Sequence, residues 1–150
     1  KFLDSEAVGG ATILPARTAH DYARIVTRSR INLAIHFGPA GPQGWEDAIS
    51  GRSFHIPASK GFMLHIDNPE IRALYDVGSE IDVFANQAEL VAKVEHYIGD
   101  PKMRKSMIEA AYKRCVPAYS LDARARDLMA QIELRLASVP VEAASGGQGH

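Results

Sequence analysis

The sequence predicts an α/β domain built on a doubly wound parallel sheet. Three short apolar segments, at residues 31–35, 62–66 and 81–85, have the length and composition of buried strands. Amphipathic helical patterns lie between and after them, so strands and helices alternate along the chain. Because such strands are joined by right-handed crossovers, we expect them to be parallel, with helices on both faces of the sheet.

The length and composition are those of one globular domain. The chain has 150 residues, within the roughly 100 to 200 residues that one domain usually contains. Hydrophobic residues make up 46% and charged residues 23%, which argues against a disordered or fibrous class. The 17 basic and 18 acidic residues balance and form no block of like charge, so no nucleic-acid partner is expected.

The single cysteine, Cys115, excludes a disulfide framework and a cysteine-based metal cluster, and it indicates a reducing compartment. No apolar run approaches the ~18 residues that span a bilayer, and residues 1–6 lack the apolar segment of a signal peptide. We therefore predict a cytoplasmic domain without a membrane span. His36, His55 and His65 lack the spacing of metal ligands, so no metal site is predicted.

Before residue 52, the sequence predicts one helix, one strand and a long loop, besides one weaker strand candidate. The helix is expected over residues 18–28 with Thr18 as its N-cap, and the strand at 31–35 follows. Residues 38–51 carry four glycines and two prolines, and loops of this length are often functional. Residues 11–14 form a fourth, weaker strand candidate; since doubly wound sheets are usually larger, we expect one or two leading units outside this chain.

Five further helices are predicted, four of them from their capping residues. A short helix covers residues 53–59, and Pro117 is expected to end the helix that precedes the last one. The four capping residues are Asn68, Asn86, Asp100 and Ser120. The domain is placed at residues 1–137, and the segment 138–150, rich in small residues, is expected to be a flexible tail.

The candidate ligand-binding residues follow from the predicted sheet, because open parallel sheets bind ligands at the carboxyl ends of their strands. Gly38, Asp67 and Asn68 lie just after predicted strands. Arg52 precedes the short helix, where its guanidinium and the helix N–H groups would act together on a diphosphate. A plain surface arginine is the alternative for Arg52.

Two further candidates flank the short helix. His55 lies one helical turn after Arg52, although a histidine in such a position is more often packed or hydrogen-bonded than catalytic. Lys60 precedes Gly61, and a solvated lysine is its alternative interpretation. The sequence has no G-x-S-x-G, G-x-x-x-x-G-K-[ST] or G-x-G-x-x-G motif, which argues against an α/β-hydrolase and a P-loop nucleotidase.

Several separated blocks of the chain resemble the C-terminal domain of the group 1 glycosyltransferases, especially the spore-maturation-protein-like branch. The blocks are residues 29–35, 52–64, 67–70, 74–75, 78–81, 89–97, 110–114 and 124–128. The resemblance covers about residues 18–130. It implies a GT-B enzyme, in which two Rossmann-like domains face each other and the C-terminal one binds the nucleotide-sugar donor.

The resemblance also implies partners and site residues. The partners are a nucleotide diphosphate sugar, which is a substrate and not a cofactor, and an N-terminal acceptor domain of the same full-length protein. The family pattern R-x-F-E-I-P-A-x-G-G places a ribose-binding glutamate where this chain has His55, and a glycine where it has Lys60. An acid eight positions before that glutamate faces the donor sugar, and Asp47 occupies this position.

These departures leave two functions open. A carboxylate accepts hydrogen bonds from two ribose hydroxyls at once, whereas a neutral imidazole offers one acceptor and one donor. The first hypothesis is a donor-binding domain of a glycosyltransferase, and the alternative is a degenerate, non-catalytic nucleotide- or glycan-binding domain. A receiver-like domain is disfavoured because no acidic cluster follows a first strand. The predicted donor-binding residues are Gly38, Asp47, Arg52, His55, Lys60, Asp67 and Asn68.

Overall fold

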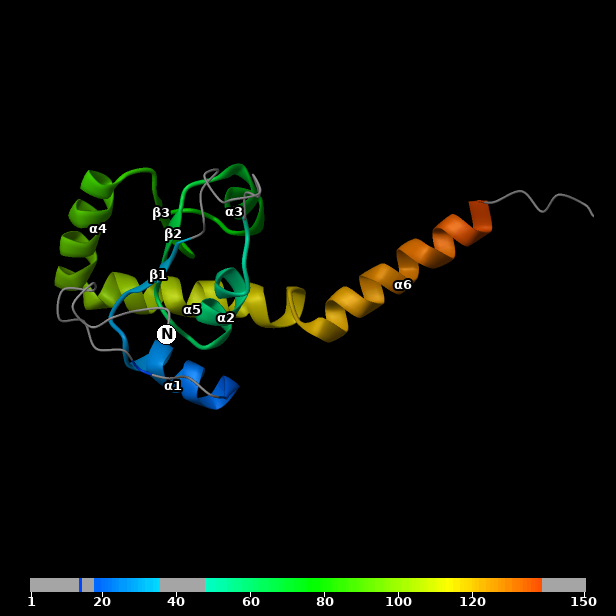
Figure 1. Ribbon diagram of the computed structural model, residues 1–150, viewed down its shortest axis with the longest axis horizontal. Helices are drawn as coiled ribbons and strands as arrows, with labels where there is room; N and C mark the ends of the chain where they lie inside the picture. Colours follow the sequence, from blue (N-terminus) through cyan, green and yellow to red (C-terminus); the bar gives the residue numbers. More distant parts are fainter. Residues whose placement is uncertain (1–13, 15–17, 36–47, 139–150) are drawn as a thin grey trace, which may run out of the picture.

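In the part of the chain that the structure describes, three parallel strands form a sheet with helices on both faces (Figure 1). The computed structural model describes residue 14 and residues 18–35 and 48–138. The strands β1 (Asn32–Ala34), β2 (Met63–Ile66) and β3 (Asp82–Phe84) lie side by side in the order β1-β2-β3. The α/β class and the parallel, Rossmann-like arrangement that the sequence predicts are confirmed.

The six helices among the described residues begin at the predicted capping residues, α2 excepted. They are α1 (Ala19–Arg28), α2 (Arg52–Ala58), α3 (Pro69–Leu74), α4 (Gln87–Gly99), α5 (Pro101–Ala118) and α6 (Leu121–Ser138). The side chains of Thr18, Asn68, Asn86 and Asp100 accept hydrogen bonds from backbone N–H groups in the first turns that follow them. Local capping chemistry therefore sets where these helices start.

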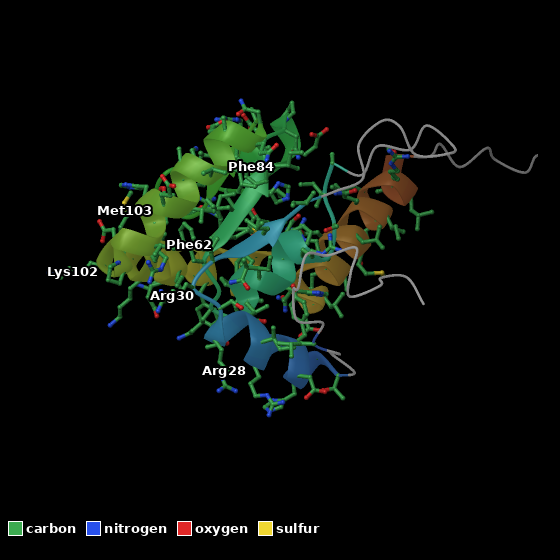
Figure 2. The ribbon with its side chains drawn as sticks, turned by 60° about the vertical axis from the view of Figure 1, so that its left-hand side comes forward. Arg28, Arg30, Phe62, Phe84, Lys102 and Met103 are labelled. Carbon is green, nitrogen blue, oxygen red and sulfur yellow. The ribbon has the colours of Figure 1, made fainter. Side chains whose placement is uncertain are left out.

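Two hydrophobic cores, one on each face of the sheet, make the fold doubly wound. Met63 of β2 belongs to the core that includes residues of α1, α2, α3 and the second half of α5. Its neighbour Leu64 belongs to the other core, between the sheet, α4 and the first half of α5. Figure 2 shows Phe62 and Phe84 on this second side, with Met103 near the start of α5.

Helix α5 ends later than the sequence predicts, and helix α6 projects from the domain. Helix α5 runs through Pro117 to Ala118, although the sequence predicts its end at Pro117. A proline in the last turn removes only one helical N–H, and the Tyr119 N–H still bonds to the Cys115 carbonyl at 2.9 Å. Helix α6 leaves the body of the domain, and none of its residues is buried (Figure 1).

Some sequence predictions fall on parts of the chain outside the described residues. These include residues 11–13 of the weak strand candidate, Gly38, Asp47 and the predicted tail from residue 139. Leu14 is described and lies in no strand. Within the described ranges, no helix combines the length and apolar character that crossing a bilayer requires.

Candidate functional site

The carboxyl edge of the sheet brings together three segments that are far apart in the sequence. Arg52, at the start of α2, donates from Nη1 to the carbonyl oxygen of Ile35, just after β1, at 2.8 Å. Asn68, two residues after β2, donates from Nδ2 to the carbonyl oxygen of Ala48 at 2.9 Å. Two of the predicted site residues, Arg52 and Asn68, thus lie where parallel sheets commonly bind ligands.

A continuous set of hydrogen bonds fixes the segment that enters α2 against the end of β2. Both serine side chains accept hydrogen bonds in this turn: Ser50 Oγ accepts from the Arg52 N–H at 3.2 Å, and Ser53 Oγ accepts from the Ser50 N–H at 3.3 Å. Ser53 Oγ also lies 2.9 Å from His65 Nε2, and His65 Nδ1 lies 2.6 Å from the Ile66 carbonyl oxygen. We call Ser50, Ser53 and His65 the anchor of α2.

Tyr75 adds a second buried contact to this anchor. Its hydroxyl donates to the Ser53 carbonyl oxygen at 2.9 Å, and its side chain is 2% exposed. Burial raises the pKa of Tyr75 well above its usual value, so the hydroxyl stays protonated as a donor. The first turn of α2 is therefore held by polar contacts on its side chain and its backbone.

Arg52 itself is exposed, and the described residues leave its charge without a carboxylate. The ion pairs of the described ranges involve other arginines and lysines. Burial raises the pKa of the neighbouring Tyr22, and the positive charge of Arg52 partly opposes that effect. The Ile35 carbonyl takes one N–H of a group with five, which leaves Arg52 able to donate to an anion.

The two predicted residues after β2 already have protein partners. Both Asp67 carboxylate oxygens accept from Arg72, at 2.6 and 2.8 Å, and this hydrogen bonding lowers the pKa of Asp67. Asn68 caps α3 through Oδ1, which accepts from the Ile71 N–H at 2.8 Å, while its Nδ2 binds Ala48. Asp67 and Asn68 therefore shape the edge of the sheet through contacts within the protein.

Lys60 lies at the opposite edge of the sheet from Arg52. It follows the last turn of α2, at the amino end of β2, where its Nζ is 3.9 Å from Glu109 Oε1 and 4.6 Å from the centre of the Tyr112 ring. Its φ of 55° is in the left-handed region, which glycine adopts at no steric cost. This geometry explains why a glycine would suit the position.

His55 is exposed on α2 and contacts the ring of Tyr22 edge-on, with centroids 6.0 Å apart. It also lines a largely apolar cavity of about 530 Å³ next to Phe54, Cys115 and Tyr119. A Cβ atom at Gly51 would lie 3.2 Å from the imidazole, so the ring folds back over the start of α2. His55 is thus near Arg52 in space as well as in sequence.

Sequence reasoning missed the anchor of α2, although one signal for it was present. His65 is the one polar residue in the apolar run 62–66, and a polar residue inside a buried strand requires a hydrogen-bond partner. The identity of that partner depends on the packing of α2 on β2.

A second polar cluster lies between β3 and α4. Asp82, 8% exposed, accepts from Lys93 Nζ at 2.9 Å and from the Tyr97 hydroxyl at 2.8 Å. Lys93 Nζ is also 3.2 Å from Glu89 Oε1. Among the described residues, no group of three or more His, Cys, Asp or Glu side chains is arranged to hold a metal ion.

Residues 6–130 match the glycosyl transferase-like family. The chain belongs to this family. The matched range includes all three strands and helices α1 to α5. No curated protein and no solved structure matches the chain. Membership indicates a glycosyltransferase kind of activity, carried by a Rossmann-like domain.

Proposed function

We propose that this domain binds the diphosphate of a nucleotide-sugar donor at the carboxyl edge of its sheet. The observation that supports the proposal is the position of Arg52. Its guanidinium is exposed, is held at the end of β1 by the Ile35 carbonyl, and has no carboxylate partner among the described residues. In a glycosyl transferase-like domain, a cation in this place suits the phosphates of a donor.

Arginine fits this role on chemical grounds. Sugar transfer from a nucleotide diphosphate sugar leaves the diphosphate with increased negative charge, and fixed donors stabilise charge where it develops. A guanidinium is always charged and presents its N–H groups in a planar fork that matches phosphate oxygens. The donor is itself a substrate, so the proposal requires no resident cofactor.

The rest of the reaction is assigned to a second domain. We place the acceptor and any catalytic base on an N-terminal domain of the same protein, in a GT-B arrangement of the spore-maturation-protein-like branch and in the cytoplasm. Transfer requires the acceptor oxygen in line with the donor sugar, and one sheet edge cannot fix both. The 150-residue chain alone should therefore bind a donor without sugar transfer.

One observation favours a second candidate function, a non-catalytic nucleotide- or glycan-binding domain. His55 stands one helical turn after Arg52, where the resemblance implies a ribose-binding glutamate. The imidazole contacts Tyr22 and can accept from at most one hydroxyl. A donor site with a weakened ribose contact would bind nucleotides poorly while keeping the phosphate contact.

Calorimetric titration with uridine diphosphate, guanosine diphosphate and their sugar conjugates tests both candidates. We expect Arg52→Ala to weaken diphosphate binding by about 1.5 to 3 kcal/mol, or one to two decades, with little change for the nucleoside alone. His55→Glu should preserve or tighten binding, because it restores an acceptor for two hydroxyls. Arg126→Ala, which removes an exposed arginine of α6, is the matched control.

The outcomes separate the candidates. Equal binding by Arg52→Ala and the starting protein would remove Arg52 from the site. Diphosphate binding that His55→Glu tightens would support a donor site with a weakened ribose contact. No binding by any variant would contradict the donor-site proposal for this chain.

A further inference from the structure

The buried hydrogen bond between Ser53 and His65 lies directly behind Arg52. Ser53 follows Arg52 in the chain, and its Oγ is 2.9 Å from His65 Nε2. Both Ser53 and His65 are 0% exposed, whereas Arg52 is exposed at the carboxyl edge. The same turn of α2 thus contacts β2 on its inner side and presents the cation on its outer side.

The contacts of His65 indicate which atom donates and which accepts in its hydrogen bond with Ser53. His65 Nδ1 lies 2.6 Å from the Ile66 carbonyl oxygen, and a carbonyl can only accept. In a neutral ring, Nδ1 therefore carries the hydrogen and Nε2 accepts from the Ser53 hydroxyl. Ser53 Oγ in turn accepts from the Ser50 N–H at 3.3 Å. The hydrogen bonds run in one direction from Ser50 through Ser53 and His65 to the end of β2.

The place of Arg52 depends on this series of bonds. Its backbone N–H donates to Ser50 Oγ at 3.2 Å, and its guanidinium reaches the Ile35 carbonyl at 2.8 Å. The guanidinium contact requires the start of α2 to keep a fixed distance from β1. Because β1 pairs with β2 in register, a bond from α2 to His65 of β2 sets that distance.

We propose that His65 is a positioning residue of the diphosphate site. Through Ser53 it holds the start of α2, so that the Arg52 guanidinium stays on the Ile35 carbonyl with its remaining N–H groups toward the ligand. The inference rests on the proposed function, in which Arg52 binds the diphosphate. His65 is buried, so it acts through Arg52 and does not touch the ligand.

Two substitutions of His65 separate positioning from general stability. The amide of His65→Gln reaches about as far as Nε2 and keeps a partner for Ser53, whereas the shorter amide of His65→Asn keeps the bond to Ile66 and loses the one to Ser53. Both substitutions remove the imidazole ring. Tyr97→Phe, which removes a buried hydroxyl from Asp82 in the β3–α4 cluster, is the control for destabilisation elsewhere.

The first measurement needs no ligand. The NMR order parameter of the Arg52 Nε–H reports how rigidly the guanidinium is held on the picosecond to nanosecond scale. We expect His65→Asn to lower it, and His65→Gln and Tyr97→Phe to leave it unchanged. An unchanged value in His65→Asn would overturn the proposal, whether or not the protein binds a nucleotide.

The second measurement is a double-mutant cycle on binding of uridine diphosphate and guanosine diphosphate. We expect His65→Asn to weaken binding about tenfold, with His65→Gln close to the starting protein. In the Arg52→Ala background, His65→Asn should have no further effect, because the residue through which it acts is gone. The same additional loss in that background would overturn the proposal. If the starting protein binds neither nucleotide, the proposed function fails, and the Arg52 order parameter alone decides the role of His65.

Discussion

A cationic side chain lies at each end of helix α2, Arg52 at its start and Lys60 just after its end, and the two have different contacts. At the start, Arg52 is held by hydrogen bonds to Ser50 and Ile35, beside the buried contact of Ser53 with His65, and it keeps donors toward solvent. At the end, Lys60 adopts a strained backbone conformation and turns to Glu109 and Tyr112 of α5. Lys60 has a carboxylate neighbour within the protein, whereas Arg52 has none among the described residues, so Arg52 is the cation open to an anionic ligand.

The largest expected effect is at the end of α2, at Gly61. A Cβ atom there would lie 2.4 Å from Val26 Cγ1 and 2.8 Å from Asn32 Nδ2, so α1 and β1 would have to move. We expect Gly61→Ala to lower the free energy of unfolding by about 2 to 3 kcal/mol, as overpacking does. Urea denaturation measures this loss. Gly99→Ala, where a Cβ atom meets nothing within 4 Å, is the control and should change stability little.

A smaller effect tests the strain at Lys60. Lys60→Gly removes the cost of a left-handed residue and loses an exposed ion pair, so we expect a net gain of about 0.5 kcal/mol in the free energy of unfolding. Lys60→Ala keeps the strained φ and loses the same contacts, so it should be slightly destabilising. If the two variants have equal stability, φ at residue 60 is not strained. Neither should change nucleotide binding, in contrast to Arg52→Ala.

The smallest effect concerns Asp67, which lies at the carboxyl edge but has its partner within the protein. Arg72 lowers its pKa in the folded state, so the stability it contributes is present above the usual value of about 3.9 and is lost as the pH falls through the folded pKa. The stability difference between the starting protein and Asp67→Asn should therefore shrink below pH 4. A difference that is constant from pH 6 to pH 2.5, measured by urea midpoints, would exclude this linkage. Asp127→Asn, in an exposed pair on α6, is the control.

The sequence predicted the strands and most helix starts because their signals are local. Apolar runs mark β1 to β3, and capping residues such as Asn68 act within three positions of themselves. The contact between Ser53 and His65 joins residues 12 apart, so it depends on how α2 packs on β2. Spacing arguments therefore do not reach the anchor of α2.

The prediction that Lys60 and Arg52 belong to one site shows a second limit of reasoning from the sequence. Both belong to the same block of the resemblance, residues 52–64, yet α2 separates them by its full length. A helix that precedes a parallel strand starts near the carboxyl edge of the sheet and ends near the amino edge. Residues at its two ends therefore lie on opposite edges, however close they are in sequence. Gly38 and Asp47 lie outside the described residues and stay predictions.

Helix α6 and the body of the domain differ in the free energy that their unfolding requires. Its 18 residues include none that is buried, and Leu121, Leu134 and Leu136 are at least 70% exposed. Unfolding α6 would uncover neither hydrophobic core, so the sheet gains almost nothing from keeping α6 folded. An isolated helix of this length is only marginally stable in water. Amide hydrogens of α6 therefore exchange through local opening, at a free energy well below that of global unfolding, while those of β2 wait for the whole domain to unfold.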